Sequence, residues 1–141
     1  MTDALSAEDR LLKLGLTLPE PPTPLANYTP FQVVGDHVYV SGQISMRGGE
    51  VITGVLGAGD LTGEDAIARG VEAAQHCALA LLAQAKRAAK GDLEAVSRLI
   101  KLTGFVASAP SFTGQPQIIN GASDLMVEVL GERGRHARAA V

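Results

Sequence analysis

Two long segments with helical spacing, separated by a strand-like stretch, constrain the fold of this chain more than any other feature. The first begins after Thr62, with Asp65 three residues later as in a capping box, and is predicted to run to about Ala89. The second covers roughly residues 116–130. Each carries an apolar stripe at helical intervals, so the fold must bury two amphipathic helices against its other elements.

Strand patterns precede, separate and follow these helices. Residues 32–44 are predicted to form a hairpin, and a short third strand is plausible at 51–55. Another strand lies within 93–108, and residues 136–141 begin the last one. The order β-β-(β)-α-β-α-β predicts an α+β fold, with a mixed sheet and both main helices packed on one face.

Helices on one face leave the other face of the sheet uncovered. Alternation along the strands assigns to that face a mixture of side chains: Tyr39, Ser41, Gln43, Thr103, Phe105, His136 and Arg138. The mixture is too apolar for open solvent and too polar for a core. We therefore expect another subunit to cover it, and a ligand pocket to lie where subunits meet.

The first 30 residues are predicted to hold a short helix and an extended arm. Ser6 and Asp9 have the spacing of a capping box, and Gly15 is a suitable stop. Four prolines between Leu18 and Pro24 resist both helix and sheet, which favours an extended chain on the surface.

Composition predicts one soluble domain covering residues 1–141 and argues against several partners. The net charge is −3 and the basic residues form no run, so nucleic acid is an unlikely partner. The single cysteine, Cys77, permits no intrachain disulfide and fits a cytoplasmic protein. The longest apolar run, 77–83, is too short to span a membrane, and residues 1–10 are not typical of a secretory signal.

Arg138 is the residue best suited to hold the carboxylate of a small organic acid. Its planar guanidinium, flanked by small residues on a strand, offers two donors that match a carboxylate. An interface salt bridge explains the same position equally well. Residues 41–43, Ser-Gly-Gln, form a second candidate, because glycine permits close approach of a ligand and the serine can donate a hydrogen bond. An ordinary strand end or bulge accounts for that spacing too.

The remaining reactive side chains predict neither a nucleophile nor a cofactor site. Cys77 lies mid-helix among apolar neighbours, with His76 pointing to a different side, so we interpret its thiol as structural. The three histidines have no metal-ligand spacing, and the glycine-rich segments match no phosphate-binding loop. We predict no metal and no cofactor.

Several of these residues together resemble the Rid (YjgF-like) family of reactive-intermediate deaminases, also labelled L-PSP endoribonucleases. The resemblance runs from about Leu14 to the end of the chain and is carried by Asn27-Tyr28, Val-Tyr-Val-Ser-Gly-Gln at 38–43, Asn120, and His136-Ala137-Arg138. The proline-rich arm and the His-Ala-Arg triplet resemble a longer branch, whose members mostly lack an assigned function. The resemblance implies a chorismate-mutase-like homotrimer with three clefts between subunits.

The resemblance also implies an activity: hydrolysis of small 2-imino or enamine acids to 2-keto acids and ammonia. Arg138 would grip the substrate carboxylate, and Tyr28 and Ser41 would line the cleft. Gly42 would allow backbone approach, and Asn120 would support the site. A non-catalytic sensor of small carboxylates would use the same arginine and stays an alternative. RNA cleavage ranks last, because the chain is acidic and has no obvious histidine pair for acid–base cleavage.

The last strand departs from the deaminase branch of that family. That branch usually has Pro-Ala-Arg-Ser followed by cysteine, whereas residues 136–140 here read His-Ala-Arg-Ala-Ala. A family glutamate expected to orient the water would fall beyond Val141. A strand that stops at Val141 would also leave an unpaired neighbour in the sheet. We therefore expect the natural protein to continue past this residue.

Overall fold

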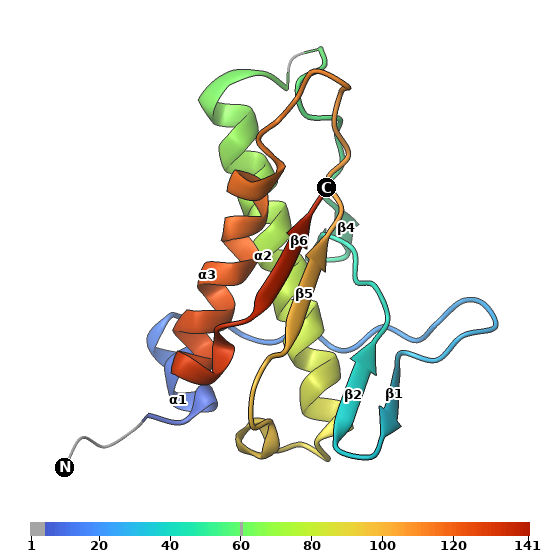
Figure 1. The fold of residues 1–141 in the computed structure, drawn as a ribbon, viewed down its shortest axis with the longest axis vertical. Helices are drawn as coiled ribbons and strands as arrows, with labels where there is room; N and C mark the ends of the chain where they lie inside the picture. The colour runs from blue at the N-terminus through green and yellow to red at the C-terminus, as the bar shows by residue number, and fades with distance from the viewer. Residues whose placement is uncertain (1–4, 60) are drawn as a thin grey trace.

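The computed structural model describes residues 5–59 and 61–141, so residues 1–4 of the predicted N-terminal segment and residue 60 lie outside the described part. Two long helices pack side by side, and the strands gather on one side of them (Figure 1). The elements in order are α1 (Ala7–Lys13), β1 (Phe31–Val34), β2 (His37–Val40), β3 (Met46–Arg47), β4 (Glu50–Val51), α2 (Gly63–Ala88), the 3-10 turn η1 (Leu93–Ala95), β5 (Lys101–Gly104), α3 (Gln115–Leu130), the 3-10 turn η2 (Gly131–Gly134) and β6 (Ala137–Ala140).

The helices begin and end close to where the sequence predicts. The α1 capping box is confirmed, with the Asp9 N–H donating to Ser6 Oγ at 3.1 Å and the Ser6 N–H to Asp9 Oδ2 at 3.4 Å. Thr62 precedes α2 as predicted, yet its side chain makes no capping hydrogen bond, so the predicted box with Asp65 is wrong. Gly63 follows with a φ of 80°, and this left-handed turn directs the first helical turn away from the threonine hydroxyl.

Glycines let the main elements approach closely around the core. A Cβ at Gly121 would lie 2.5 Å from the carbonyl oxygen of Val71, so α3 packs directly on the backbone of α2. A Cβ at Gly104 would lie 2.4 Å from Ile119, so β5 packs directly on α3. The core therefore lies between α2, α3 and β5, with α1 closing one end. Among the described residues, no helix combines the length and apolarity needed to cross a bilayer.

The described strands form three separate two-stranded ladders rather than the single mixed sheet that we predicted. The pairs β1–β2 and β3–β4 are antiparallel, and β5–β6 is parallel. The predicted strand to Ile44 ends at Val40, because the Gln43 amide donates to the carbonyls of the two preceding residues and occupies acceptors that a ladder would use. The strand predicted at 51–55 is reduced to the end of β4.

The register of β5 with β6 decides which way Arg138 points. Leu102 is buried against the helices and pairs with Arg138, so the two side chains lie on the same face. The prediction that Arg138 shares the uncovered face with Thr103 and Phe105 is therefore wrong, and His136, two residues before Arg138, also faces α3. Alternation along a strand groups residues by face, but only the pairing with β5 determines which face the helices cover.

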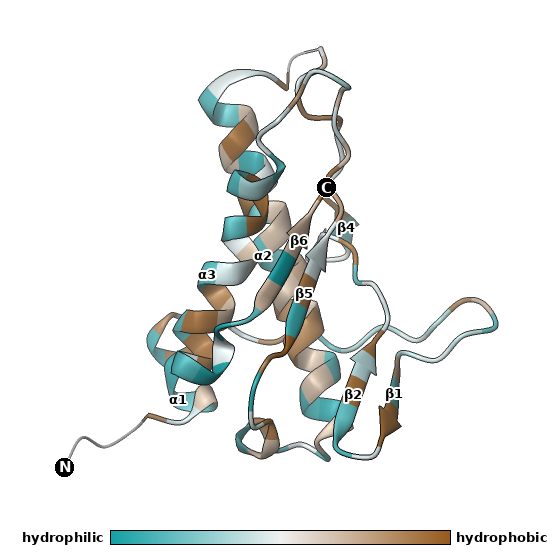
Figure 2. Cartoon of the chain, viewed as in Figure 1, coloured by the Kyte–Doolittle hydropathy of each residue, from teal (hydrophilic) through white to brown (hydrophobic). Residues whose placement is uncertain are grey.

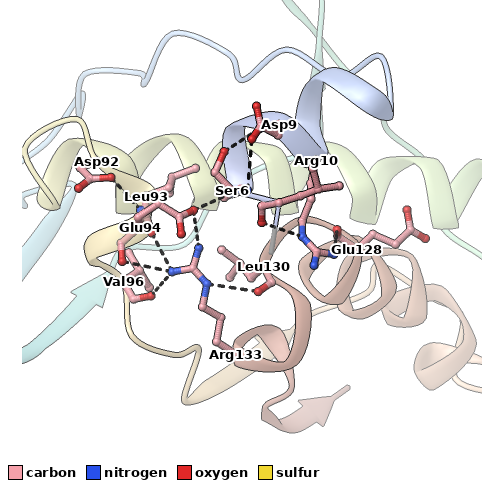
Figure 3. A network of polar contacts seen from close by, with 12 residues as sticks. Ser6, Asp9, Arg10, Asp92, Leu93, Glu94, Val96, Glu128, Leu130 and Arg133 are labelled. Atoms are coloured by element: carbon pink, nitrogen blue, oxygen red, sulfur yellow. Dashed lines mark hydrogen bonds and ion pairs between the residues drawn. The ribbon is translucent and has the colours of Figure 1, made fainter. Parts of the chain in front are cut away.

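The side chain of Arg133 in η2 joins three distant segments (Figure 3). Its Nη1 donates to the carbonyls of Leu93, Glu94 and Val96 at 3.2, 3.4 and 2.6 Å, and its Nε donates to the last carbonyl of α3 at 3.2 Å. Its Nη2 donates to Glu94 Oε1 at 2.8 Å. The same oxygen accepts the N–H of Ala7 at 2.6 Å, which satisfies a free donor at the start of α1.

Candidate functional site

Arg138 extends from β6 to the polar side of α3. Its Nη1 donates to Asn120 Oδ1 at 2.7 Å and to Ser123 Oγ at 3.2 Å. Asn120 and Ser123 are three residues apart and so lie on one side of the helix. The structure thus brings together two of the predicted site residues and adds Ser123, which the sequence analysis missed. The signal for it was a pair of polar residues at helical spacing in an otherwise largely apolar helix.

No carboxylate within residues 5–59 and 61–141 forms an ion pair with Arg138. Over the same residues, its Nε and Nη2 have no hydrogen-bond acceptor, so the edge formed by these two nitrogens is available. The guanidinium is held at one nitrogen and open at the other two. This is a geometry suited to a carboxylate that binds side-on with both oxygens.

His136 lies behind Ser123 and defines the direction of the hydrogen bonds. Its Nδ1 is 2.6 Å from the carbonyl oxygen of Gly134, and its Nε2 is 2.9 Å from Ser123 Oγ. Because a carbonyl only accepts, Nδ1 carries the proton in this arrangement. In this tautomer, Nε2 accepts a hydrogen bond from the Ser123 hydroxyl, and the serine oxygen in turn accepts from Arg138.

Tyr28, Ser41 and Gly42 form a second group beside the β1–β2 hairpin. Ser41 Oγ donates to the carbonyl of Thr29 at 2.6 Å, which holds the serine next to the segment that carries Tyr28. The Ser41 proton is therefore already used, and toward a ligand this hydroxyl offers lone pairs rather than the donor that we predicted. The Tyr28 side chain is well exposed, and the residue is 57% accessible.

Nothing in the described chain requires glycine at position 42. Its φ lies outside the left-handed region, and a Cβ there would meet no atom within 4 Å. The β1–β2 hairpin and β6 lie on opposite sides of β5 (Figure 1). Among the described residues, no hydrogen bond joins Ser41 to Arg138 or to its partners on α3. The five predicted site residues thus form two separate groups, one around Arg138 and one around Ser41.

A groove of about 270 Å³ runs between α2 and α3 beside Asn120. Its lining includes the carboxylates of Asp124 and Glu128 and no cationic side chain. An organic acid would be repelled there, so the groove is not the carboxylate site. No three His, Cys, Asp or Glu side chains of the described residues gather closely enough to share a metal ion.

Cys77 is partly buried in α2, and burial raises the pKa of its thiol. We expect native Cys77 to react with iodoacetamide more slowly than free cysteine at about pH 8, because fewer thiolates are present below the raised pKa. The rate should climb as the pH rises, and denaturant should remove the difference. Mass spectrometry of timed samples measures the alkylation rate. Native Cys77 that reacts as fast as free cysteine would contradict the interpretation of its thiol as structural.

Known proteins resemble this chain over almost its whole length. Protein TCP17 of Trypanosoma cruzi is 46% identical over 133 residues, which are 93% of this chain and 79% of that protein. The crystal structure of Atu1372 from Agrobacterium tumefaciens, a protein described as having unknown function, is 48% identical, with a TM-score of 0.82 over 96% of this chain and 79% of that one. A "putative endoribonuclease" from Shewanella oneidensis is 36% identical, with a TM-score of 0.87 over 95% of this chain and 85% of that one.

A family model also matches the chain. It covers residues 8–141 and is described as "YjgF/chorismate_mutase-like, putative endoribonuclease". The match includes α2, α3, the six strands of the described residues and both groups of site residues. It confirms the resemblance drawn from the sequence: this chain belongs to the YjgF/chorismate mutase-like family.

Proposed function

We propose that the protein hydrolyses small 2-imino and enamine carboxylic acids to 2-keto acids and ammonia in clefts between subunits. The observation that carries the proposal is Arg138. Its guanidinium is anchored to α3 at Nη1, has an open Nε–Nη2 edge and has no carboxylate partner among the described residues. A cation presented in this way favours a small carboxylate as its ligand.

The proposal requires an assembly, because the two groups of site residues lie apart in one chain. A homotrimer would bring Arg138 of one copy to Tyr28 and Ser41 of another. Exposed apolar side chains support such an interface: Phe105 is 81% exposed and Tyr39 is 65% exposed. Figure 2 draws most of β1 in the apolar colour, at an outer edge of the molecule. Apolar strands of this kind need a cover.

We expect light scattering to give three times the chain mass of 14.6 kDa at micromolar concentration. Phe105→Glu should shift the mass toward the monomer, because it places a charge in the proposed interface. Leu12→Glu is the matched control, since Leu12 is similarly exposed but lies on α1, away from the strands. A wild-type protein that is monomeric would remove the basis for an intersubunit cleft.

The chemistry asks little of the protein beyond positioning. An imine carbon is already electrophilic, so holding it beside an ordered water supplies much of what hydrolysis needs. Water adds to that carbon, both of its protons pass to the nitrogen, and the C–N bond breaks to release ammonia and leave a keto group. Tyr28, whose side chain is exposed, can relay one of these protons, by giving its hydroxyl proton to the departing nitrogen and taking one from the attacking water.

The direct test follows the lifetime of an imine. A serine or threonine dehydratase supplies it, and semicarbazide traps what has not been hydrolysed. Wild-type protein should lower the semicarbazone yield, and Arg138→Ala should not. Arg135→Ala removes a nearby arginine that is only paired with Glu132 on the surface, and should behave as wild type. No acceleration by the wild type over buffer would reject hydrolysis.

A non-catalytic sensor of small carboxylates is the second candidate. It is favoured by Ser41, whose proton is already donated to Thr29 and so is not available for catalysis. Calorimetry with 2-ketobutyrate, pyruvate and benzoate separates the two candidates, because binding without turnover identifies a sensor. Labelled RNA belongs in the same series, since a relative is described as a "putative endoribonuclease", although the net charge of −3 disfavours RNA binding.

A further inference from the structure

We propose that Ser123 and His136 are positioning residues that hold Arg138 with its Nε–Nη2 edge toward the ligand carboxylate. The inference rests on the proposed carboxylate binding and deepens it. Neither residue touches the ligand. Both act through the Arg138 Nη1 atom. Ser123 accepts a hydrogen bond from it, and His136 orients the Ser123 hydroxyl.

The first step of the argument is the fixed direction of the hydrogen bonds. The Gly134 carbonyl, 2.6 Å from His136 Nδ1, holds the imidazole in one tautomer. In that tautomer, Nε2 accepts a hydrogen bond from the Ser123 hydroxyl, whose oxygen is 2.9 Å away. A serine hydroxyl that is free to rotate presents either a proton or a lone pair to a neighbour. This one presents only a lone pair, which is what a guanidinium requires.

The second step is the pair of acceptors that meet at one nitrogen. Asn120 Oδ1 and Ser123 Oγ both accept from Nη1, and both project from the same side of α3. Two acceptors fixed on a rigid helix hold the same guanidinium nitrogen and so restrict rotation of the guanidinium plane. Binding a ligand then requires less ordering of a long, flexible side chain, which is the advantage of preorganisation.

The third step is that stability alone does not account for the network. Arg138 is exposed, and the contacts lie at the edge of β6 rather than in the core. Hydrogen bonds that hold an exposed arginine contribute little to folding. A chain of four ordered polar groups behind one exposed cation is better explained by what the cation binds.

Calorimetry with 2-ketobutyrate and benzoate tests the proposal. Ser123→Ala should weaken binding about five- to tenfold, which corresponds to one hydrogen bond of ordinary net strength, because the serine acts on the ligand only through Arg138. Ser123→Thr keeps the hydroxyl and should rescue most of the affinity. Gln117→Ala, on an exposed part of the same helix and outside the network, is the control and should bind as wild type. Equal affinities for wild type and Ser123→Ala would overturn the proposal while leaving the proposed function intact.

A double-mutant cycle separates positioning from a structural role. His136→Phe should weaken binding less than Ser123→Ala does, and should cause no further loss in the Ser123→Ala background, because the histidine acts only through the serine. Additive losses would show that His136 supports the fold independently. Thermal unfolding of every variant identifies any that fail to fold.

The Arg138 Nε–H resonance gives a readout that needs no ligand. It is assigned by its disappearance in Arg138→Ala, and we expect it to be sharp in the wild type and broadened or shifted in Ser123→Ala. If the wild type binds none of the acids, the proposed function fails, and this resonance alone decides the positioning role. An identical signal in both proteins would refute it.

Discussion

Replacing Arg138 with lysine is expected to weaken the binding of 2-ketobutyrate by about ten- to one-hundredfold, because hydrogen bonds to charged groups contribute about 1.5–3 kcal/mol. Lysine keeps the positive charge and can still approach Asn120 and Ser123. Its side chain has only one nitrogen, however, so the bidentate contact that the open Nε–Nη2 edge offers is lost. Isothermal calorimetry at fixed ionic strength measures the change.

Two further variants make this result specific. Arg135→Lys alters an exposed arginine whose partner is Glu132, and should leave the affinity unchanged. Arg138→Met removes the charge as well as the fork, and should bind still more weakly than the lysine variant. If Arg138→Lys binds as tightly as the wild type, Arg138 makes no bidentate contact with the ligand and the carboxylate site lies elsewhere.

The sequence predicted most accurately those elements whose signals are local. The Ser6–Asp9 capping box lies within one helical turn and is found as predicted. The limits of α2 and α3 are each within about one residue of the prediction, because apolar periodicity and the flanking glycines act over short distances. Local signals also predicted a hairpin within residues 32–44, and the turn between β1 and β2 falls at residues 35–36.

The face on which Arg138 lies required information that is not local. The alternation along residues 136–141 correctly groups His136 with Arg138, but either face of such a strand could have met the helices. The alternation along the strands placed Arg138 on the uncovered face, because it carries no information about the strand with which residues 136–141 pair. The parallel register with Leu102 reverses that assignment. A charged side chain can lie on this face because β6 is an edge strand beside the polar side of α3, where Asn120 accepts from Arg138.

Ser123 shows a related limit of sequence reasoning. A serine in a helix is usually interpreted through its own helix, where it is neutral or slightly unfavourable. Here its importance comes from His136, the residue just before β6, and Arg138 in β6, which both contact its hydroxyl. The contact joins segments that are more than a dozen residues apart, and only the packing of β6 against α3 brings them together.

Arg133 is the residue on which the N-terminal part of the fold depends most. Its guanidinium satisfies carbonyls in η1 and at the end of α3, and it neutralises the Glu94 carboxylate that accepts the first N–H of α1 (Figure 3). Its side chain is 21% exposed, so these groups are largely, though not fully, withdrawn from water. Removing a charged donor from such a site leaves several acceptors without a partner.

We therefore expect Arg133→Ala to lower the free energy of unfolding by about 2–3 kcal/mol, less than the cost of breaking a fully buried ion pair because water can partly replace the lost donor. Arg133→Lys should recover part of the loss, since one ammonium group cannot reach the carbonyls of η1 and α3 and the Glu94 carboxylate together. Arg135→Ala, two residues away and exposed, should change stability by no more than about 0.5 kcal/mol. Urea unfolding at equal protein concentration measures all three, so that any assembly affects them alike.

Hydrogen exchange adds a local readout: in Arg133→Ala, protection should fall first at the amides of α1, because Glu94 is no longer held against the Ala7 N–H. A variant as stable as Arg135→Ala, with α1 still protected, would show that the packing of Leu11 and its neighbours, rather than Arg133, holds α1 in place.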